Sequence, residues 1–145
     1  MGTGSSDWAT ERTAAAHEHQ KRLRARRQVE HAQAAAILAE FAAVAPARLP
    51  PQPLVIRGYG GHGCARSTIT GWYLRIDRTL AVGIDGQFYV LTAHLRLLDR
   101  FRRLELHPSP APLVIGAGGR DGDTIALEDA LERLLPGWRS EGTPV

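Results

Sequence analysis

An uninterrupted run of helix-forming residues near the start of the chain limits the folds open to this protein. Residues 7–45 contain no glycine or proline and are rich in Ala, Glu, Gln, Arg and Leu, which are suited to a helix interior. Pro46 follows, and further prolines stand at positions 50, 51 and 53, where a helix cannot easily continue. The sequence therefore predicts one long N-terminal helix that ends at residue 45.

The two halves of this predicted helix differ in their apolar content. In the second half, five residues fall within an arc of about 120° on a helical wheel: Ile37, Leu38, Phe41, Val44 and Ala45. Before residue 34 the apolar stripe is reduced to Trp8, Ala16 and Leu23, and Arg27 and Glu30 interrupt it. We therefore expect the second half to pack on the body, and the first half to project into solvent or to meet another chain.

The composition fits one soluble domain without a membrane span. The chain has 145 residues, of which 43% are hydrophobic, and no apolar run approaches the roughly 20 residues that a membrane span needs. The first six residues lack the charged and apolar regions of a secretory signal. A single cysteine, Cys64, excludes an internal disulfide. Together these features predict a cytoplasmic protein.

Charge is distributed unevenly along the chain. The formal net charge of +3 arises from +1 in residues 1–47, +6 in residues 48–120 and −4 in residues 121–145. Seventeen of the eighteen basic residues are arginine, which fits GC-rich coding as well as it fits a function. A basic middle region attracts anionic partners but does not select among them.

Proline and strand patterns divide the remainder of the chain. Residues 46–53 predict a stiff connector, residues 54–137 a compact β-rich body, and residues 138–145 a loose tail. The expected fold class is α+β: the long N-terminal helix, a small mainly antiparallel sheet of about five or six short strands with a central hairpin, and a short C-terminal helix. Besides the hairpin, the expected elements are strands at 54–57, 68–76, 102–106, 113–115 and 124–127, a short helix at 94–101 and a final helix at 128–135.

The hairpin at residues 80–92 carries the clearest local signal. Asp85-Gly86 stands between two apolar runs, a pattern typical of a two-residue type I′ turn. That turn would place Gly83 opposite Phe88 and Val82 opposite Tyr89. If Asp77-Arg78 makes a short turn, one expected face holds Trp72, Leu74, Ala81, Gly83, Phe88 and Val90, and the other holds Tyr73, Arg75, Leu80, Val82, Ile84, Tyr89 and Leu91. We expect the first face to receive the helix around Phe41.

A glycine-rich segment after the first expected strand matches the spacing G-x-G-x-x-G. In a dinucleotide site such glycines open a helix, whereas an extended segment follows here, so we do not expect nucleotide binding of that kind. A surface loop is the favoured interpretation, and contact with a phosphate or a partner is the alternative. The residues of this loop that could serve a ligand or a reaction are Gly58, Gly60, His62, Gly63, Cys64 and Arg66.

The remaining motifs do not favour a metal, a cofactor or catalysis. His62 and Cys64 could be zinc ligands, but only His94 and His107 remain in the body, and zinc prefers four ligands with paired spacing. A second glycine-rich segment, 116–123, lacks the further ligands of a calcium loop, and we expect a tight connection there. No catalytic constellation stands out, so we predict no cofactor or metal and regard an enzyme as the less favoured class.

Two arginine clusters are the candidates for contact with a partner or with nucleic acid. The first, on the predicted long helix, comprises Lys21, Arg22, Arg24, Arg26 and Arg27. The second comprises Arg96, Arg100, Arg102 and Arg103, which could join Tyr73, Arg75 and Tyr89 in an aromatic and basic surface. The first cluster points in almost every direction around a helix, which suits a solvated helix or one inserted into an anionic groove.

These patterns leave three hypotheses for function. The leading one is a non-enzymatic binding or adaptor module that acts through its projecting helix, in contact with a protein partner or with a second copy of itself. The second is a nucleic-acid-binding or ribosome-associated basic protein. The third is a small enzyme or ligand-binding domain that uses the loop from Gly58 to Gly63.

Overall fold

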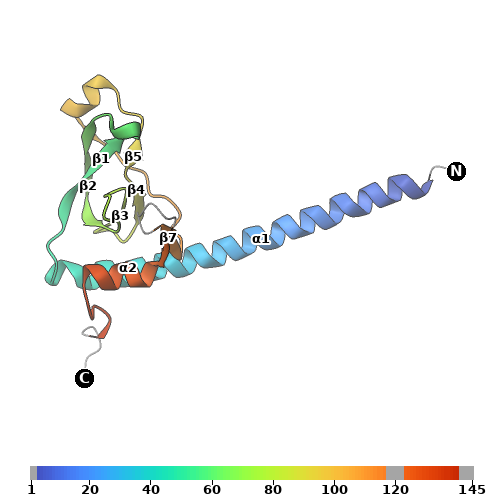
Figure 1. The fold of residues 1–145 in the computed structure, drawn as a ribbon. Coiled ribbons are helices and arrows are strands. Elements are labelled where there is room, and N and C mark those ends of the chain that lie inside the picture. The colour runs from blue at the N-terminus through green and yellow to red at the C-terminus, as the bar shows by residue number, and fades with distance from the viewer. Residues whose placement is uncertain (1–2, 117–122, 141–145) are drawn as a thin grey trace.

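One long helix, α1, forms the N-terminal part of the protein and extends well beyond the body (Figure 1). The structure is a computed structural model that describes residues 3–116 and 123–140. α1 runs from Thr3 to Val44 and passes into the 3-10 turn η1 (Ala45–Ala47), which contains Pro46. The long N-terminal helix is thus confirmed, and it begins at Thr3 rather than at residue 7.

The body is built on a six-stranded mixed sheet. Its strands are β1 (Gln52–Gly58), β2 (Cys64–Tyr73), β3 (Leu80–Gly83), β4 (Phe88–Val90), β5 (Thr92–Ala93) and β6 (Arg103–Leu104). The order is β4-β3-β2-β1-β5, with β6 beside β2. The pairings β1–β2, β2–β3 and β3–β4 are antiparallel, whereas β5 and β6 each pair in parallel, with β1 and β2 respectively. The predicted α+β class with a small sheet and a hairpin is confirmed.

The hairpin forms where Asp85-Gly86 predicts it, but its register differs by one residue. Val82 pairs with Phe88 and Ala81 with Tyr89, so the expected pairs Gly83–Phe88 and Val82–Tyr89 are wrong. Gly86 has a positive φ of 77°, and its N–H bonds to the Gly83 carbonyl at 2.9 Å. This is the three-residue loop in which a left-handed glycine closes the turn. The Asp85 carboxylate stabilises it by accepting a bond from the Gln87 N–H at 2.9 Å.

The register shift exchanges side chains between the two faces of the sheet. Val82 and Leu80 lie on the face of Trp72, Leu74 and Phe88, whereas the sequence analysis places them on the other face. Ala81 in turn lies with Tyr89, Leu91 and Leu54 on the opposite face. A slip of one residue has this effect because successive side chains of a strand point to opposite faces.

The main core forms where α1 and the C-terminal helix cover the Trp72 face of the sheet. Phe41 of α1 is fully buried and contacts two indole rings edge to face, Trp72 at 5.5 Å and Trp138 at 5.4 Å between centroids. The expectation that the helix around Phe41 packs on the Trp72 face is therefore confirmed. Trp138, which the sequence analysis assigns to a loose tail, is buried in this core with 2% of its surface exposed.

The C-terminal elements complete this layer. β7 (Val114–Gly116) and β8 (Thr124–Ala126) form a separate two-stranded antiparallel sheet, and α2 (Leu127–Leu134) follows and lies beside α1 (Figure 1). The expected strand at 113–115 and the final helix at 128–135 are present, each displaced by one residue, and the expected strand at 124–127 ends one residue early. The expected glycine-rich connection lies largely outside the described residues.

Two further expectations are wrong in physically clear ways. The helix expected at 94–101 forms only in its second part, as the short 3-10 helix η3 (Leu97–Phe101). Thr92 and Ala93, just before the expected helix, pair with β1 as strand β5. The connector expected at 46–53 ends early, because β1 already begins at Gln52. Proline is tolerated in a strand at an irregularity, and the register of β1 shifts directly after Pro53.

Candidate functional site

The part of α1 from Asp7 to Glu30, here called the arm, is a continuous helix that does not pack on the described part of the body. Every residue of the arm is exposed, including Trp8, which keeps 60% of its surface open. At 1.5 Å per residue the arm is on the order of 36 Å long, and Figure 1 shows it leaving the body in a straight line. The arm therefore presents its whole circumference to solvent.

Docking of α1 on the body begins sharply at the next residue. His31 Nδ1 lies 2.7 Å from the carbonyl oxygen of Ala111. Beyond it Ala34, Leu38 and Phe41 are fully buried, and their spacing of four and then three residues places them on one helix face. The change from exposed to buried follows the sequence, because this apolar stripe begins only at residue 34.

The first arginine cluster lies entirely on the arm. Its members Lys21, Arg22, Arg24, Arg26 and Arg27 are all exposed, and at 3.6 residues per turn they surround the helix axis instead of forming a stripe. Within the described residues none of them forms an ion pair. The arm thus carries a ring of unneutralised positive charge.

The second arginine cluster forms no aromatic surface with Tyr73 and Tyr89. Tyr89 is buried, and its hydroxyl donates a 2.6 Å hydrogen bond to Asp85. Burial first, and then this bond and the Asp85 charge, raise the pKa of Tyr89 to about 12. The Tyr73 hydroxyl accepts a bond from the Val55 N–H at 3.0 Å. Burial leaves the Tyr89 ring no face to stack on a base, and the Arg78 guanidinium lies over the Tyr73 ring, 5.4 Å from its centroid.

The second cluster instead surrounds an exposed apolar turn that the sequence analysis missed. Residues 96–103, here called the tip, contain η3, and on it Leu97, Leu98 and Phe101 are 74%, 68% and 79% exposed. All four arginines of the cluster are exposed too. The signal is present in the sequence Arg-Leu-Leu-Asp-Arg-Phe-Arg-Arg, but the expectation of a packed helix there concealed it.

Asp99 holds the tip in shape from within. Its carboxylate accepts a hydrogen bond from the Arg96 backbone N–H at 2.7 Å and one from the Arg102 guanidinium at 3.2 Å. The bond from the Arg96 N–H is the main reason that the pKa of Asp99 is lowered, and Arg102 adds to it. The Asp99 carboxylate is thus bonded within the tip, and the outer surface of the tip is basic and apolar.

The loop from Gly58 to Gly63 joins β1 to β2 and lies on the surface. It contains the 3-10 turn η2 (Tyr59–Gly61), and Gly60, Gly61 and Gly63 all have positive φ. His62 and Cys64 are exposed. With Arg96 and Arg100 of the tip they line an open hollow rather than a closed cavity. Arg66 is exposed on β2, beside Arg103 of β6.

The surroundings of His62 and Cys64 bear on the hypotheses of a metal site and of a nucleophile at this loop. In the described ranges no group of three or more His, Cys, Asp or Glu side chains could hold a metal ion. The ring of Tyr59, and not Cys64, packs on His94, with centroids 4.6 Å apart. The open position of His62 and Cys64 weakens the hypothesis of an enzyme at this loop, because water has free access to both side chains.

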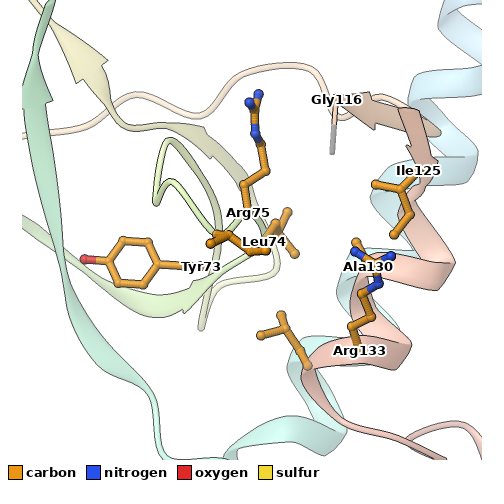
Figure 2. Close-up of a pocket in the computed structure, with 9 residues that line it drawn as sticks. Tyr73, Leu74, Arg75, Gly116, Ile125, Ala130 and Arg133 are labelled. Carbon is orange, nitrogen blue, oxygen red and sulfur yellow. The ribbon is translucent and has the colours of Figure 1, made fainter. Parts of the chain in front are cut away.

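A more enclosed pocket of about 240 Å³ lies between the β2–β3 turn and α2. Figure 2 shows Arg75 and Arg133 on opposite sides of it, with Tyr73 pointing away. Arg75 is bound to Asp77 at 2.9 Å, and its Nε is buried without a hydrogen-bond partner in the described structure. Among the described residues, those that line the pocket include no carboxylate, histidine or cysteine. The pocket could hold a small ligand, but it offers no group for general acid–base catalysis by those side chains.

Comparison with known proteins found no matching family model, no similar curated protein and no similar solved structure. In the described ranges, no helix is long and apolar enough to cross a membrane. The class that the fold defines is a small α+β protein with an exposed helical arm and an exposed basic tip.

Proposed function

We propose that this protein is a binding module that engages a protein partner, or a second copy of itself, through the arm. The observation that carries the proposal is the full exposure of a continuous helix from Asp7 to Glu30. Helices in proteins gain most of their stability from the packing of one face against other elements, and the arm has no such contact with its own body. A partner that packs on the arm would supply the missing contact.

The residues of the arm favour a particular mode of contact. Trp8, Leu23 and Val29 are its large exposed apolar side chains, and they do not repeat at the a and d positions of a heptad. Towards the N-terminus the docking stripe of Ala34 continues only through Leu23 and Ala16, and Arg27 and Glu30 interrupt it. The arm therefore suits a partner that surrounds it, such as a groove with acidic walls, better than a two-stranded coiled coil.

The test compares the full chain with a chain that starts at His31 and keeps every docking residue. Light scattering on a size-exclusion column measures the mass, and affinity purification from the native host measures partners. We expect a partner or a dimer mass with the full chain only. Fluorescence of the buried Trp72 and Trp138 checks that the shorter chain is folded. Equal masses and equal partners for two folded chains would contradict the proposal.

Nucleic acid is the second candidate, and the ring of basic side chains on the arm favours it. Each phosphate contact releases counterions and makes binding steeply dependent on salt. A variant with Arg22→Gln, Arg24→Gln and Arg27→Gln would then bind RNA more weakly and with a shallower salt dependence. If nuclease treatment leaves all partners in place, the protein proposal gains and this candidate is removed.

A further inference from the structure

The tip combines two properties that a folded protein rarely exposes together. Three large apolar side chains, Leu97, Leu98 and Phe101, each keep more than two-thirds of their surface in solvent. They belong to one short turn of five residues, and this segment, gold in Figure 1, lies at the end of the body opposite α1 and α2. A clustered apolar patch of this kind on a protein surface marks an interaction site.

The charges around these side chains identify the chemistry of the partner. Residues 96–103 contain four arginines and one aspartate, a net charge of +3, and the aspartate is Asp99, which is bound inside the tip. Arg66 of β2 lies beside Arg103 in the register of β2 and β6 and adds a further positive charge. The nearest other acid along the chain is Glu105. The surface that the tip contacts should therefore be anionic as well as apolar.

We propose that the tip is a docking site for an anionic phospholipid surface, with Leu97, Leu98 and Phe101 inserted between the headgroups and the arginines bound to lipid phosphates. Aliphatic and aromatic side chains enter the interfacial region of a bilayer, and long basic side chains extend back to the charged headgroups. Binding at the bilayer interface strengthens with buried apolar area and with electrostatic attraction to anionic lipids, and the tip supplies both. This inference rests on a different surface from the arm and is independent of the function proposed for it.

The alternatives fit the tip less well. Single-stranded nucleic acid is bound by successive bases stacking on exposed aromatic rings, whereas the tip offers one such ring, Phe101, beside two leucines, and Tyr89 is buried in the body. A protein partner would more often meet an apolar patch with a packed centre, whereas the tip is a single turn of five residues at the end of the body (Figure 1). An insertion of a few side chains into a soft surface matches that shape.

The first experiment measures co-sedimentation of the full chain with vesicles. We expect binding to vesicles of equal parts phosphatidylcholine and phosphatidylserine, and little binding to vesicles of phosphatidylcholine alone. Binding should weaken as salt is raised, because the headgroup attraction is screened. Failure to bind the anionic vesicles at low salt would overturn the proposal.

Matched variants separate the tip from the rest of the surface. Leu97→Ser, Leu98→Ser and Phe101→Ser together should reduce vesicle binding by more than about tenfold. The control variant carries Ile76→Ser, Ile84→Ser and Val114→Ser, which are also exposed but lie on the α1 and α2 side of the body, and it should bind as the unaltered chain does. Equal losses in the two variants would show that the tip is not the binding site.

A second pair of variants tests the charges. Arg96→Gln, Arg100→Gln and Arg103→Gln should weaken binding by about fivefold for each arginine removed, and Arg102 is kept because it binds Asp99. The same number of charges removed from the arm, with Arg22→Gln, Arg24→Gln and Arg27→Gln, should leave vesicle binding largely intact. If the arm variant loses binding and the tip variant keeps it, the lipid contact belongs to the arm and the proposal fails.

Insertion is read directly from fluorescence. In a chain with Phe101→Trp and Trp8→Phe, the remaining indoles of Trp72 and Trp138 are buried, so a spectral change reports on position 101. We expect a blue shift with anionic vesicles and none with single-stranded RNA. A shift with RNA, or retention on RNA that the serine variant loses, would assign the tip to nucleic acid instead.

Discussion

The imidazole of His31 donates a hydrogen bond from Nδ1 to the carbonyl oxygen of Ala111, over 2.7 Å. Because a carbonyl oxygen can only accept, the proton must reside on Nδ1. The bond joins α1 to the segment before β7 and lies at the point where the helix leaves the body. On one side of His31 the helix is exposed through the whole arm, and on the other side its stripe of apolar residues is buried.

Replacing His31 with alanine should remove the hydrogen bond that ties α1 to Ala111 and lower the stability of the protein. We expect the free energy of unfolding to fall by about 0.5–1.5 kcal/mol, the usual contribution of one hydrogen bond, when it is measured by urea titration and tryptophan fluorescence. His19→Ala, on the exposed arm, is the matched control and should change the value by less than about 0.5 kcal/mol. Equal effects of the two substitutions would show that the bond to Ala111 contributes nothing to stability.

Replacing Phe41 with alanine should be among the most damaging single changes to stability. The ring is fully buried between Trp72 and Trp138, and its loss leaves a cavity against both indoles. A large buried aromatic typically contributes about 3–5 kcal/mol on truncation to alanine. Phe101→Ala, at the exposed tip, should leave the urea midpoint nearly unchanged. A small loss for Phe41→Ala would mean that the two indoles close the cavity by themselves.

The bond from Tyr89 to Asp85 predicts a loss of stability at high pH. Tyr89 has a pKa raised to about 12 from its ordinary 10.0, so the folded protein holds this proton more tightly than the unfolded chain does. The stabilisation is fully present below pH 10.0 and declines as the pH rises towards about 12. Urea midpoints across this range should fall, and Tyr89→Phe should flatten the decline, whereas Tyr59→Phe, at an exposed ring, should leave it in place.

Two glycines with the same φ allow backbone strain to be separated from close packing. Gly86 and Gly61 both have a φ of 77°, but a Cβ on Gly86 would lie 3.2 Å from the Ala39 Cα of α1, whereas one on Gly61 would meet nothing within 4 Å. Gly61→Ala should therefore cost about 1–2 kcal/mol, for the left-handed backbone alone. Gly86→Ala should cost more, because the hairpin must also move away from the helix. Equal losses of stability in thermal unfolding would show that the hairpin can move away from α1 at no cost in free energy.

The sequence predicts the elements of this fold better than their exact pairing. The long helix, its docking stripe and the hairpin follow from local rules, namely helix propensity, periodicity and a turn dipeptide. The hairpin register does not, since Asp-Gly fits both a two-residue turn and a three-residue loop. Side chains decide between them here, because Asp85 binds both the Gln87 N–H and the Tyr89 hydroxyl, and the second contact depends on the packing of Tyr89.

The structure of the tip and the burial of Trp138 could not be predicted from local sequence patterns, because both depend on residues distant in the chain. Residues 94–101 have a helical composition, but Thr92 and Ala93 just before them pair in parallel with β1. The two paired segments lie far apart along the chain, and neither has a local sequence pattern that predicts the pairing. Trp138 follows Gly137, which resembles the end of a structured region, and only the position of Phe41 in space shows where its ring belongs.

The placement of Phe41 between two indoles also sets an order of events during synthesis. Trp72 emerges from the ribosome soon after the helix, so the first of the two ring contacts can form early. The second waits for Trp138, nearly a hundred residues after Phe41. Until then the docking stripe of α1 is covered on one side only, and the nascent chain exposes apolar side chains that a chaperone could bind.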